Sequence, residues 1–320
     1  MSSPYRPNRP NNPKTDKTNK TIRKFVRNHH NRPKVPIVPI VLIFPILPNL
    51  ITNYSRLITP PLCAFLFFSY LCAENRISMR YFIELQYDGA AYCGWQRQPD
   101  AVTVQGMIED KLSMLRRTPT EIVGAGRTDT GVNASFYVAH FDSDTEVDCP
   151  QLRYKLNKVL PDDIAILRIY EVEPEKHARF DAKMREYTYF LVMRKSPFRR
   201  FSAWHFAVDL DVEKMNEAAA KLLEYEDFTS FAKLNSNNKT NICHITHAEW
   251  VVESDATLRF TIRADRFLRN MVRAIVGTLV DVGRGRYSVD EFEDIIRSKD
   301  LSRSSSGAPA CGLFLSDVQY

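Results

Sequence analysis

From Met79 to the end, apolar and polar residues alternate along the chain with the periods of strands and helices. Tyr81, Ile83, Leu85 and Tyr87 alternate with Phe82, Glu84 and Gln86, which is typical of a half-buried strand, and Asp88-Gly89 ends it. Apolar residues every three or four positions predict a helix over 103–115. Four more elements follow: strands near 121–124, 136–142 and 164–172, and a helix near 151–159.

A second run of elements begins at residue 185 and has a similar order. We predict a strand over 185–192, a helix that Asp211 caps, strands near 245–253 and 258–264, helices over 266–282 and 289–297, and a last strand over 312–318. The order β-α-β-β-α-β, met twice, favours an α+β fold of two ferredoxin-like halves. We expect the halves, 79–180 and 181–320, to join into one broad antiparallel sheet with a central active-site cleft.

Composition changes abruptly where these patterns begin. Residues 1–78 hold 11 of the 18 prolines and none of the 11 glycines. Residues 1–34 are predicted to be disordered, and prolines interrupt the apolar stretch 35–51. The apolar stretch 62–73 is too short to span a bilayer. Two interpretations remain open: a leader outside the working protein, with Met79 as the true start, or a membrane tether or targeting segment.

Charge divides at the same place. Residues 1–78 carry 12 basic and two acidic residues, so 32 basic and 36 acidic residues remain for 79–320, a net charge of −4 within a chain of +6. A body of this kind can bind nucleic acid only by gathering its arginines on one surface. Six scattered cysteines without a CxxC pair indicate reduced thiols in a cytosolic protein. We expect no membrane association of residues 79–320.

The strongest candidate for chemistry is the glycine-rich segment 121–134. It places Arg127 and Asp129 directly after a predicted strand, in a turn with Gly124, Gly126 and Gly131. In an extended loop the two charged side chains project to the same side, so the arginine could bind a phosphate beside the carboxylate. That pairing fits glycosidic chemistry. The alternative is a tight hairpin in which the aspartate merely caps a turn.

Two further patterns each allow a functional and a structural interpretation. Tyr187 and Tyr189 alternate along a strand among basic residues, so they could stack on a nucleobase or could simply pack across the sheet. In the predicted helix 266–282, Arg266, Arg269 and Arg273 form one stripe. The stripe is either solvated or half-buried, and a half-buried arginine would keep a carboxylate partner ionised.

Metal and cofactor chemistry find little support in the sequence. Cys243, His244 and His247 are close together, but they alternate along a strand and lack a fourth ligand. Phosphate-binding loops, dinucleotide fingerprints, Ser-His-Asp order and HExxH are all missing from the sequence. We therefore expect neither a metal nor a cofactor.

Six short motifs follow one another along residues 79–320: Tyr87-Asp-Gly89 with Gly94-Trp95-Gln-Arg97-Gln, Gly126-Arg127-Thr-Asp129-x-Gly131-Val, Ala178-Arg179-Phe180 with Arg185-x-Tyr187, Asp227-Phe-Thr-Ser-Phe231, Met271-Val-Arg273 with Val276-Gly277-Thr-Leu, and Ala308-Pro-Ala-x-Gly312-Leu313. In these motifs, and in their order and approximate spacing, the chain resembles the TruA family of tRNA pseudouridine synthases.

The resemblance implies a homodimer that converts uridine to pseudouridine at positions 38, 39 and 40 of the tRNA anticodon arm, without a cofactor. It implies that Asp129 is the catalytic carboxylate and that Arg127 helps to extrude the target base. Tyr187 would stack against that base, Arg273 would be the ion-pair partner of Asp129, and Leu313 would form an apolar wall. Whether Asp129 attacks the sugar carbon or removes the neighbouring proton stays open.

The chain departs from the family pattern at Thr130, where alanine is common, and at Asn133, where histidine is common. We expect both to affect loop packing rather than chemistry. Two rival functions remain. A non-catalytic RNA-binding protein could have the same halves, although the Arg127 and Asp129 pairing argues against it. A membrane-anchored interaction protein has support only in residues 1–78.

Overall fold

The computed structural model describes residues 78–233, 239–254 and 256–320. They belong to one compact unit. The predictions of a disordered or non-native leader and of a membrane tether concern residues that lie, apart from Ser78, outside this description. Among the described helices, none combines the length and the apolar character that crossing a membrane requires.

One nine-stranded sheet forms the base of the fold. Its main path is β4 (Ile164–Val172), β1 (Met79–Tyr87), β3 (Asn133–Ser143), β9 (Leu313–Gln319), β5 (Met184–Val192), β8 (Thr257–Ala264) and β7 (Ile245–Ser254). Two short strands complete it: β2 (Val123–Gly124) pairs with β3, and β6 (Trp204–His205) pairs with β5. The predicted broad sheet in a mixed α+β fold is confirmed. The division into two ferredoxin-like halves, 79–180 and 181–320, stays an interpretation.

The sheet is mostly antiparallel, but two of its strand pairs are parallel: the short pair of β5 with β6 and, in the middle of the sheet, the pair of β3 with β9. Strand β3 runs parallel to β9, with Asn133 opposite Phe314 and Ala134 opposite Leu315. On its other side β9 is antiparallel to β5. The last strand of the chain therefore lies between the first and second runs of elements, and the expectation of a purely antiparallel sheet is wrong at this junction.

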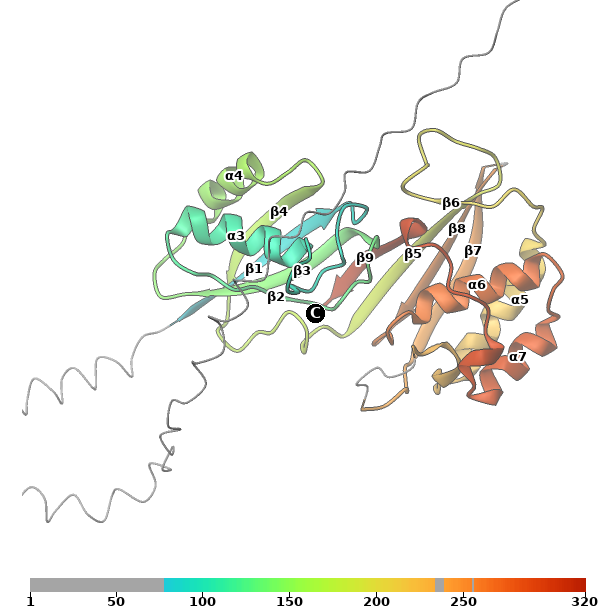
Figure 1. Ribbon diagram of the computed structural model, residues 1–320. Coiled ribbons are helices and arrows are strands. Elements are labelled where there is room, and N and C mark those ends of the chain that lie inside the picture. Colours follow the sequence, from blue (N-terminus) through green and yellow to red (C-terminus); the bar gives the residue numbers. More distant parts are fainter. Residues whose placement is uncertain (1–77, 234–238, 255) are drawn as a thin grey trace, which may run out of the picture. The chain divides into compact units, whose positions relative to one another are not determined.

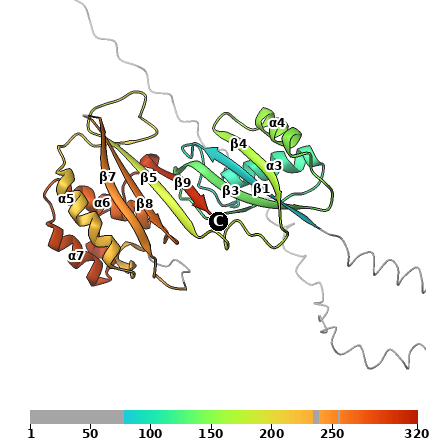
Figure 2. The ribbon, with the colours of Figure 1, turned by 180° about the vertical axis from the view of Figure 1, so that it is seen from behind.

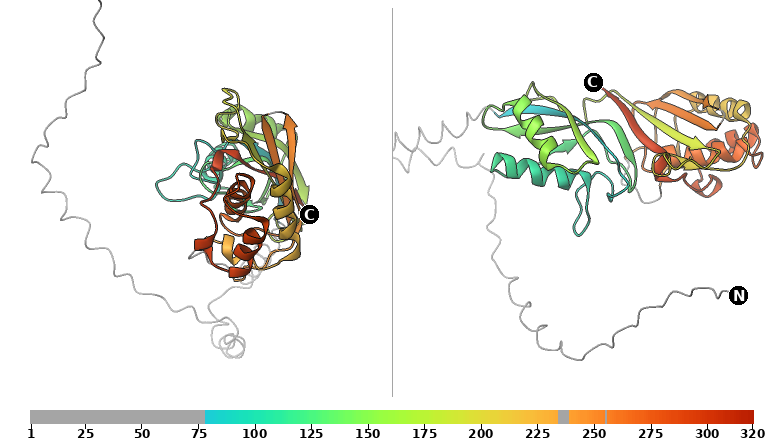
Figure 3. Two further views of the ribbon diagram at one scale, coloured as in Figure 1. Left: turned by 90° about the vertical axis from the view of Figure 1, so that its right-hand side faces the viewer. Right: turned by 90° about the horizontal axis from the view of Figure 1, so that it is seen from above.

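Five helices are present in the described residues: α3 (Val104–Arg116), α4 (Cys149–Val159), α5 (Val212–Lys221), α6 (Met271–Gly283) and α7 (Val289–Ser298). In Figure 1, α3 and α6 lie in front of the strands, and in the view from behind in Figure 2 the strands lie in front of both helices. Seen from above, in the right panel of Figure 3, the two helices lie on the same side of the sheet. The opposite, open face carries no helix in these views.

The alternation of apolar residues explains how the sheet meets its helices. In β1, Ile83, Leu85 and Tyr87 are buried in a cluster with residues of α3 and α4. A second cluster joins β5, β8 and α6, and Tyr187 packs against both clusters. Side-chain caps fix the helix starts, since Thr103 accepts a hydrogen bond from the amide of Gly106, and Asp211 accepts one from Lys214 as predicted.

The start of α6 differs from the prediction. The expected helix 266–282 begins only at Met271, because Asn270 adopts a left-handed conformation with φ of 65°. The Asp265 carboxylate accepts hydrogen bonds from the amides of His244 and Arg266, which stabilises a turn there. Arg266 and Arg269 therefore precede the helix, and the predicted helical stripe of three arginines is wrong.

Residues 173–183 connect the two runs of elements and are tied to β3 by His140. The buried His140 ring accepts a hydrogen bond at Nδ1 from the amide of Ala178, at 3.1 Å, and meets the ring of His177 edge-on at 4.7 Å. Burial, and then the positive charge of Arg80, lowers the pKa of His140 to about 4. The folded protein therefore contains His140 in its neutral form near pH 7.

This arrangement predicts a loss of stability in mild acid. The unfolded state protonates His140 below its ordinary pKa of 6.5, whereas the folded state resists protonation until about 4. The contribution of this residue is therefore complete above 6.5 and is lost as the pH falls from 6.5 towards 4. Urea unfolding at about pH 7.5 and about pH 5 should show a smaller pH effect for His140→Gln than for wild type. The exposed His205→Gln is the control, and an unchanged pH effect in His140→Gln would refute the assignment.

Candidate active site

Asp129 lies in the turn between β2 and β3, at the edge of the junction with β9. Gly131, two residues later, has a φ of 76°, a left-handed conformation that glycine adopts without strain. The amide of Val132 closes the turn on the Asp129 carbonyl at 3.1 Å, and the amide of Gly131 bonds the Tyr92 carbonyl at 3.3 Å. The Asp129 side chain is 26% exposed, so it is accessible but held close to the protein.

Residues of β1 and of the segment that follows it hold the backbone just before Asp129. The hydroxyls of Tyr87 and Thr128 form a buried hydrogen bond of 2.9 Å, and the amide of Trp95 donates to the Thr128 carbonyl at 3.3 Å. Gly94 brings its own backbone against this carbonyl, since a Cβ at that position would lie 2.4 Å from the Thr128 oxygen. Three separate contacts therefore position the peptide that carries the carboxylate.

Two arginines flank the Asp129 carboxylate. Arg269 Nε lies 3.5 Å from one oxygen, and Arg273 Nη1 lies 3.9 Å from the other. Both distances exceed the roughly 2.8 Å of a charge-assisted hydrogen bond. Arg273, 23% exposed, is anchored because its Nε donates to the Ala308 carbonyl at 2.6 Å, whereas Arg269 is 59% exposed. One fixed and one more accessible cation thus stabilise negative charge at this point.

Tyr187 extends from β5 towards the same carboxylate. Burial first, and then the charge of Asp129, raises the pKa of Tyr187 to about 12. Its ring meets the edge of Phe267 at 5.1 Å. Tyr189, the other aromatic of the pair, is instead a core residue whose hydroxyl donates to the Pro309 carbonyl at 2.9 Å. The two tyrosines therefore occupy different environments, and of the two only Tyr187 has a pKa that the charge of Asp129 raises.

The two remaining predicted site residues, Arg127 and Leu313, lie in contrasting environments. Arg127 is exposed and makes no hydrogen bond or ion pair with the described residues, so its side chain is available to a substrate. Leu313 is buried beside Tyr189, opposite it on the neighbouring strand, and belongs to the second core cluster. Of the predicted set, the structure brings Asp129, Arg273 and Tyr187 together.

Sequence reasoning missed two residues that organise the site. Arg269 was only one member of a supposed helical stripe, yet it approaches Asp129 more closely than Arg273 does. Arg185 is partly buried, and its guanidinium donates hydrogen bonds to the carbonyls of Ala125, Arg179, Ala182 and Asp265. In the sequence, only the motif Arg185-x-Tyr187 pointed to a role for Arg185.

Asn133 links the site to the segment just before the last strand, β9. Its side-chain oxygen accepts from the amide of Gly89 at 2.7 Å, and its nitrogen donates to the carbonyl of Cys311 at 2.9 Å. Among the described residues, no group of His, Cys, Asp and Glu has the geometry to hold a metal ion. In particular, Cys243 is buried, while His244 and His247 face Glu226 and Glu249.

A half-buried carboxylate flanked by two arginines, with the partly buried Tyr187 nearby, is suited to acid–base or nucleophilic chemistry on an anionic substrate. The model of the family described as tRNA pseudouridine synthase matches residues 85–181 and 218–320. The proteins named tRNA pseudouridine synthase A from Bacteroides fragilis and Parabacteroides distasonis are 51% and 52% identical over 242 residues, 75% of this chain and 96% of each relative. The one from Thermoanaerobacter sp. is 39% identical over 240 residues, 74% of this chain and 98% of the relative. The chain belongs to the tRNA pseudouridine synthase family.

The Tyr87 contact predicts a defect in turnover rather than in substrate affinity. Tyr87→Phe removes the hydroxyl that holds Thr128. We expect this loss to raise the activation free energy by about 1 kcal/mol, which lowers kcat about fivefold. Single-turnover and binding measurements on unmodified tRNA should show kcat reduced and Kd unchanged. Tyr81→Phe, which removes a hydroxyl from the same core that accepts a hydrogen bond from the amide of Val147 instead of bonding Thr128, is the control. Equal losses in both variants would argue against a positioning role.

Proposed function

We propose that this protein isomerises uridine to pseudouridine at positions 38, 39 and 40 of the tRNA anticodon arm, with Asp129 as the catalytic carboxylate. The observation that carries the proposal is the Asp129 carboxylate, partly exposed in a fixed turn, with Arg269 and Arg273 within 4 Å of its oxygens. A carboxylate that merely capped a hairpin would need neither cation. Membership of the family supplies the tRNA substrate and the reaction class, an isomerisation.

The reaction breaks the bond between the sugar carbon C1′ and the base nitrogen N1. The uracil then turns in place and rejoins the sugar through C5, which loses its proton while N1 gains one. Two routes lead to the same product: Asp129 attacks C1′, or it removes the neighbouring sugar proton. In either route the carboxylate must be ionised and must reach the ribose, which the exposed side of the turn permits.

The neighbouring side chains have separate tasks in this proposal. A base within a stem must leave its stack before a side chain can reach its sugar. Arg127, exposed and unpaired among the described residues, would contact the backbone phosphate and favour extrusion. Tyr187 would stack on the extruded uracil, since its neutral phenol adds no charge beside Asp129. Leu313 would close the apolar side of the pocket.

We further propose a cytosolic homodimer that works without a metal or another cofactor. The proposal rests on the family and on the groups present at the site. All the proton transfers of the isomerisation can be served by a carboxylate and by solvent, and the arginines supply the positive charge that a phosphate requires.

The decisive test is conversion of unmodified tRNA by purified protein, mapped by carbodiimide treatment and primer extension. Wild type should produce pseudouridine at the three positions. Asp129→Asn should lower the rate by a factor of about 100 or more, because amide nitrogen and oxygen cannot replace the carboxylate as base or nucleophile. Asp209→Asn, an exposed aspartate outside the site, should keep the wild-type rate. Equal activity of Asp129→Asn and wild type would refute the role of Asp129.

The two flanking arginines should behave differently. Arg273→Met removes the anchored cation, so it should lower kcat about tenfold while tRNA affinity changes little. Arg269→Met removes an exposed cation that phosphate can reach, so it should mainly raise Kd and reduce the salt dependence of binding by about one charge. Filter binding over a salt series, together with single-turnover rates, separates the two. Equal loss of binding and turnover in Arg273→Met would contradict its pairing with Asp129.

A further inference from the structure

The side chain of Arg185 joins three separate segments of the chain beside the candidate active site. Its Nη1 donates hydrogen bonds to the carbonyls of Ala182 at 2.7 Å and Asp265 at 2.8 Å. Its Nη2 donates to the carbonyls of Arg179 at 2.7 Å and Ala125 at 3.3 Å. One guanidinium therefore connects the segment after β2, the connection that precedes β5 and the turn that precedes α6.

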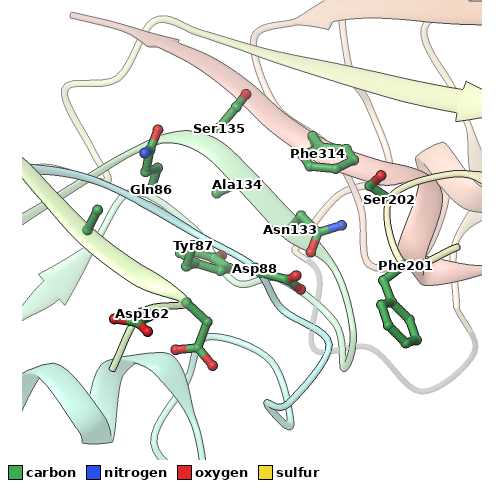
Figure 4. A pocket seen from close by; sticks show the side chains of 12 residues that line it. Gln86, Tyr87, Asp88, Asn133, Ala134, Ser135, Asp162, Phe201, Ser202 and Phe314 are labelled. Atoms are coloured by element: carbon green, nitrogen blue, oxygen red, sulfur yellow. The ribbon is translucent and has the colours of Figure 1, made fainter. Parts of the chain in front are cut away.

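The donors of this guanidinium are occupied by the protein itself. Its two terminal nitrogens carry four N–H groups, which match the four carbonyls. Among the described residues, no carboxylate lies within ion-pair distance of Arg185, and burial lowers the pKa of its guanidinium. Nor does Arg185 line the cavity of about 290 Å³ beside Asn133 and Phe314 that Figure 4 shows. Arg185 therefore holds protein segments rather than a ligand.

The segment after β2, residues 125–132, contains Asp129, and we call it the carboxylate turn. Both backbone groups of Ala125 are engaged, because its amide donates to the Val138 carbonyl at 2.8 Å and its carbonyl accepts from Arg185. The carboxylate turn is thus held where it leaves β2, four residues before Asp129. A shift of Ala125 would therefore move the peptide that carries the carboxylate.

The turn that precedes α6, residues 265–270, contains Arg269, and we call it the arginine turn. Phe267, in its middle, meets the ring of Tyr187 edge-on at 5.1 Å. Tyr187 follows Arg185 by two residues on β5, so the two side chains leave the strand on the same face. The hydrogen bond from Arg185 to the first carbonyl of the arginine turn therefore fixes that turn against the strand that presents Tyr187.

We propose that Arg185 is a positioning residue of the isomerisation, which holds the carboxylate turn and the arginine turn at a fixed separation. The inference rests on the proposed function, because it takes Asp129 as the catalytic carboxylate. The guanidinium nitrogens of Arg269 and Arg273 lie 3.5 and 3.9 Å from the Asp129 oxygens, too far for a charge-assisted hydrogen bond to set their position. The backbone must set it, and Arg185 bonds the backbone of both turns.

The planar shape of the guanidinium suits this task. Its terminal nitrogens point in fixed directions, so the carbonyls that they bind are held at set positions relative to one another. A lysine ammonium keeps the positive charge but presents three donors from a single point. Arg185→Lys therefore removes the positioning and keeps the charge, which makes it the informative substitution.

Amide hydrogen exchange, measured by mass spectrometry on the full chain, tests the positioning without the reaction. Arg185→Lys should speed exchange about tenfold in the carboxylate turn and the arginine turn, because lost hydrogen bonds let both open more often. The core strand β1 should keep its wild-type rates. Unchanged exchange in the two turns would overturn the proposal.

Arg116→Lys is the matched control. The partly buried Arg116 also has a guanidinium bound by protein groups, since it donates to the Asp142 carbonyl and the Ser143 hydroxyl. These two residues end β3, whereas the carboxylate turn leads into its first residue, Asn133. Arg116→Lys should therefore leave exchange in both turns, and turnover, at wild-type values. Equal changes in the two variants would show that Arg185 only stabilises the fold.

Single-turnover kinetics on unmodified tRNA measure the consequence for the chemical step. Arg185→Lys should lower the rate constant about tenfold with Kd unchanged, because no terminal donor of Arg185 is free for the RNA. Combined with Arg273→Met, it should cost less than the product of the two separate losses, since both changes disturb the same pairing with Asp129. A loss confined to Kd, or fully independent effects in the double variant, would contradict the positioning role.

Asp265→Ala tests the same turn if Arg185→Lys proves too unstable to measure. The Asp265 carboxylate accepts hydrogen bonds from the amides of His244 and Arg266, so its removal loosens the arginine turn without altering the Arg185 side chain. The turnover rate should again fall with Kd unchanged, and an unchanged rate would count against the proposal.

The inference and the proposed function fail in different ways. If Asp129→Asn keeps the wild-type rate, the proposed function fails in its catalytic residue. If Asp129→Asn is inactive while Arg185→Lys keeps both wild-type exchange and wild-type turnover, the catalytic role stands and only the positioning role is wrong.

Discussion

The position of β9 is the constraint on which the rest of this structure depends. The last strand of the chain lies between β3 and β5, parallel to one and antiparallel to the other. Without it, the strands that precede residue 173 and those that follow residue 183 would form two separate edges. The side chain of Asn133 reinforces the junction by bonding backbone groups on both sides. Asp129 lies four residues before Asn133, where β3 pairs with β9. The strand β9 that joins the sheet therefore also positions the carboxylate.

The electrostatics of the candidate site follow from that junction. Asp129 comes from the turn before β3, Tyr187 from β5, and Arg269 and Arg273 from the turn and first residues of α6. A carboxylate close to two cations that do not hydrogen-bond to it keeps its oxygens available for a substrate. Meanwhile Tyr87 and Trp95 hold the adjoining backbone, so the charge is fixed in position before any ligand arrives.

The two faces of the sheet serve different purposes. The helix face holds the apolar clusters and the Asp129 site, whereas the open face presents aromatic rings with charges of both signs.

Local periodicity determined much of this protein without any tertiary information. Strand β4 was predicted at the observed bounds, and Asp211 was identified as a helix cap, because both depend on neighbours within a few residues. The motif around Asp129 likewise pointed to the family. The parallel entry of β9, the turn that begins α6 at Met271 and the approach of Arg269 to Asp129 were decided by the fold alone. Each depends on contacts between residues far apart in the chain. The spacing of apolar positions reflects only near neighbours, so it cannot predict such contacts.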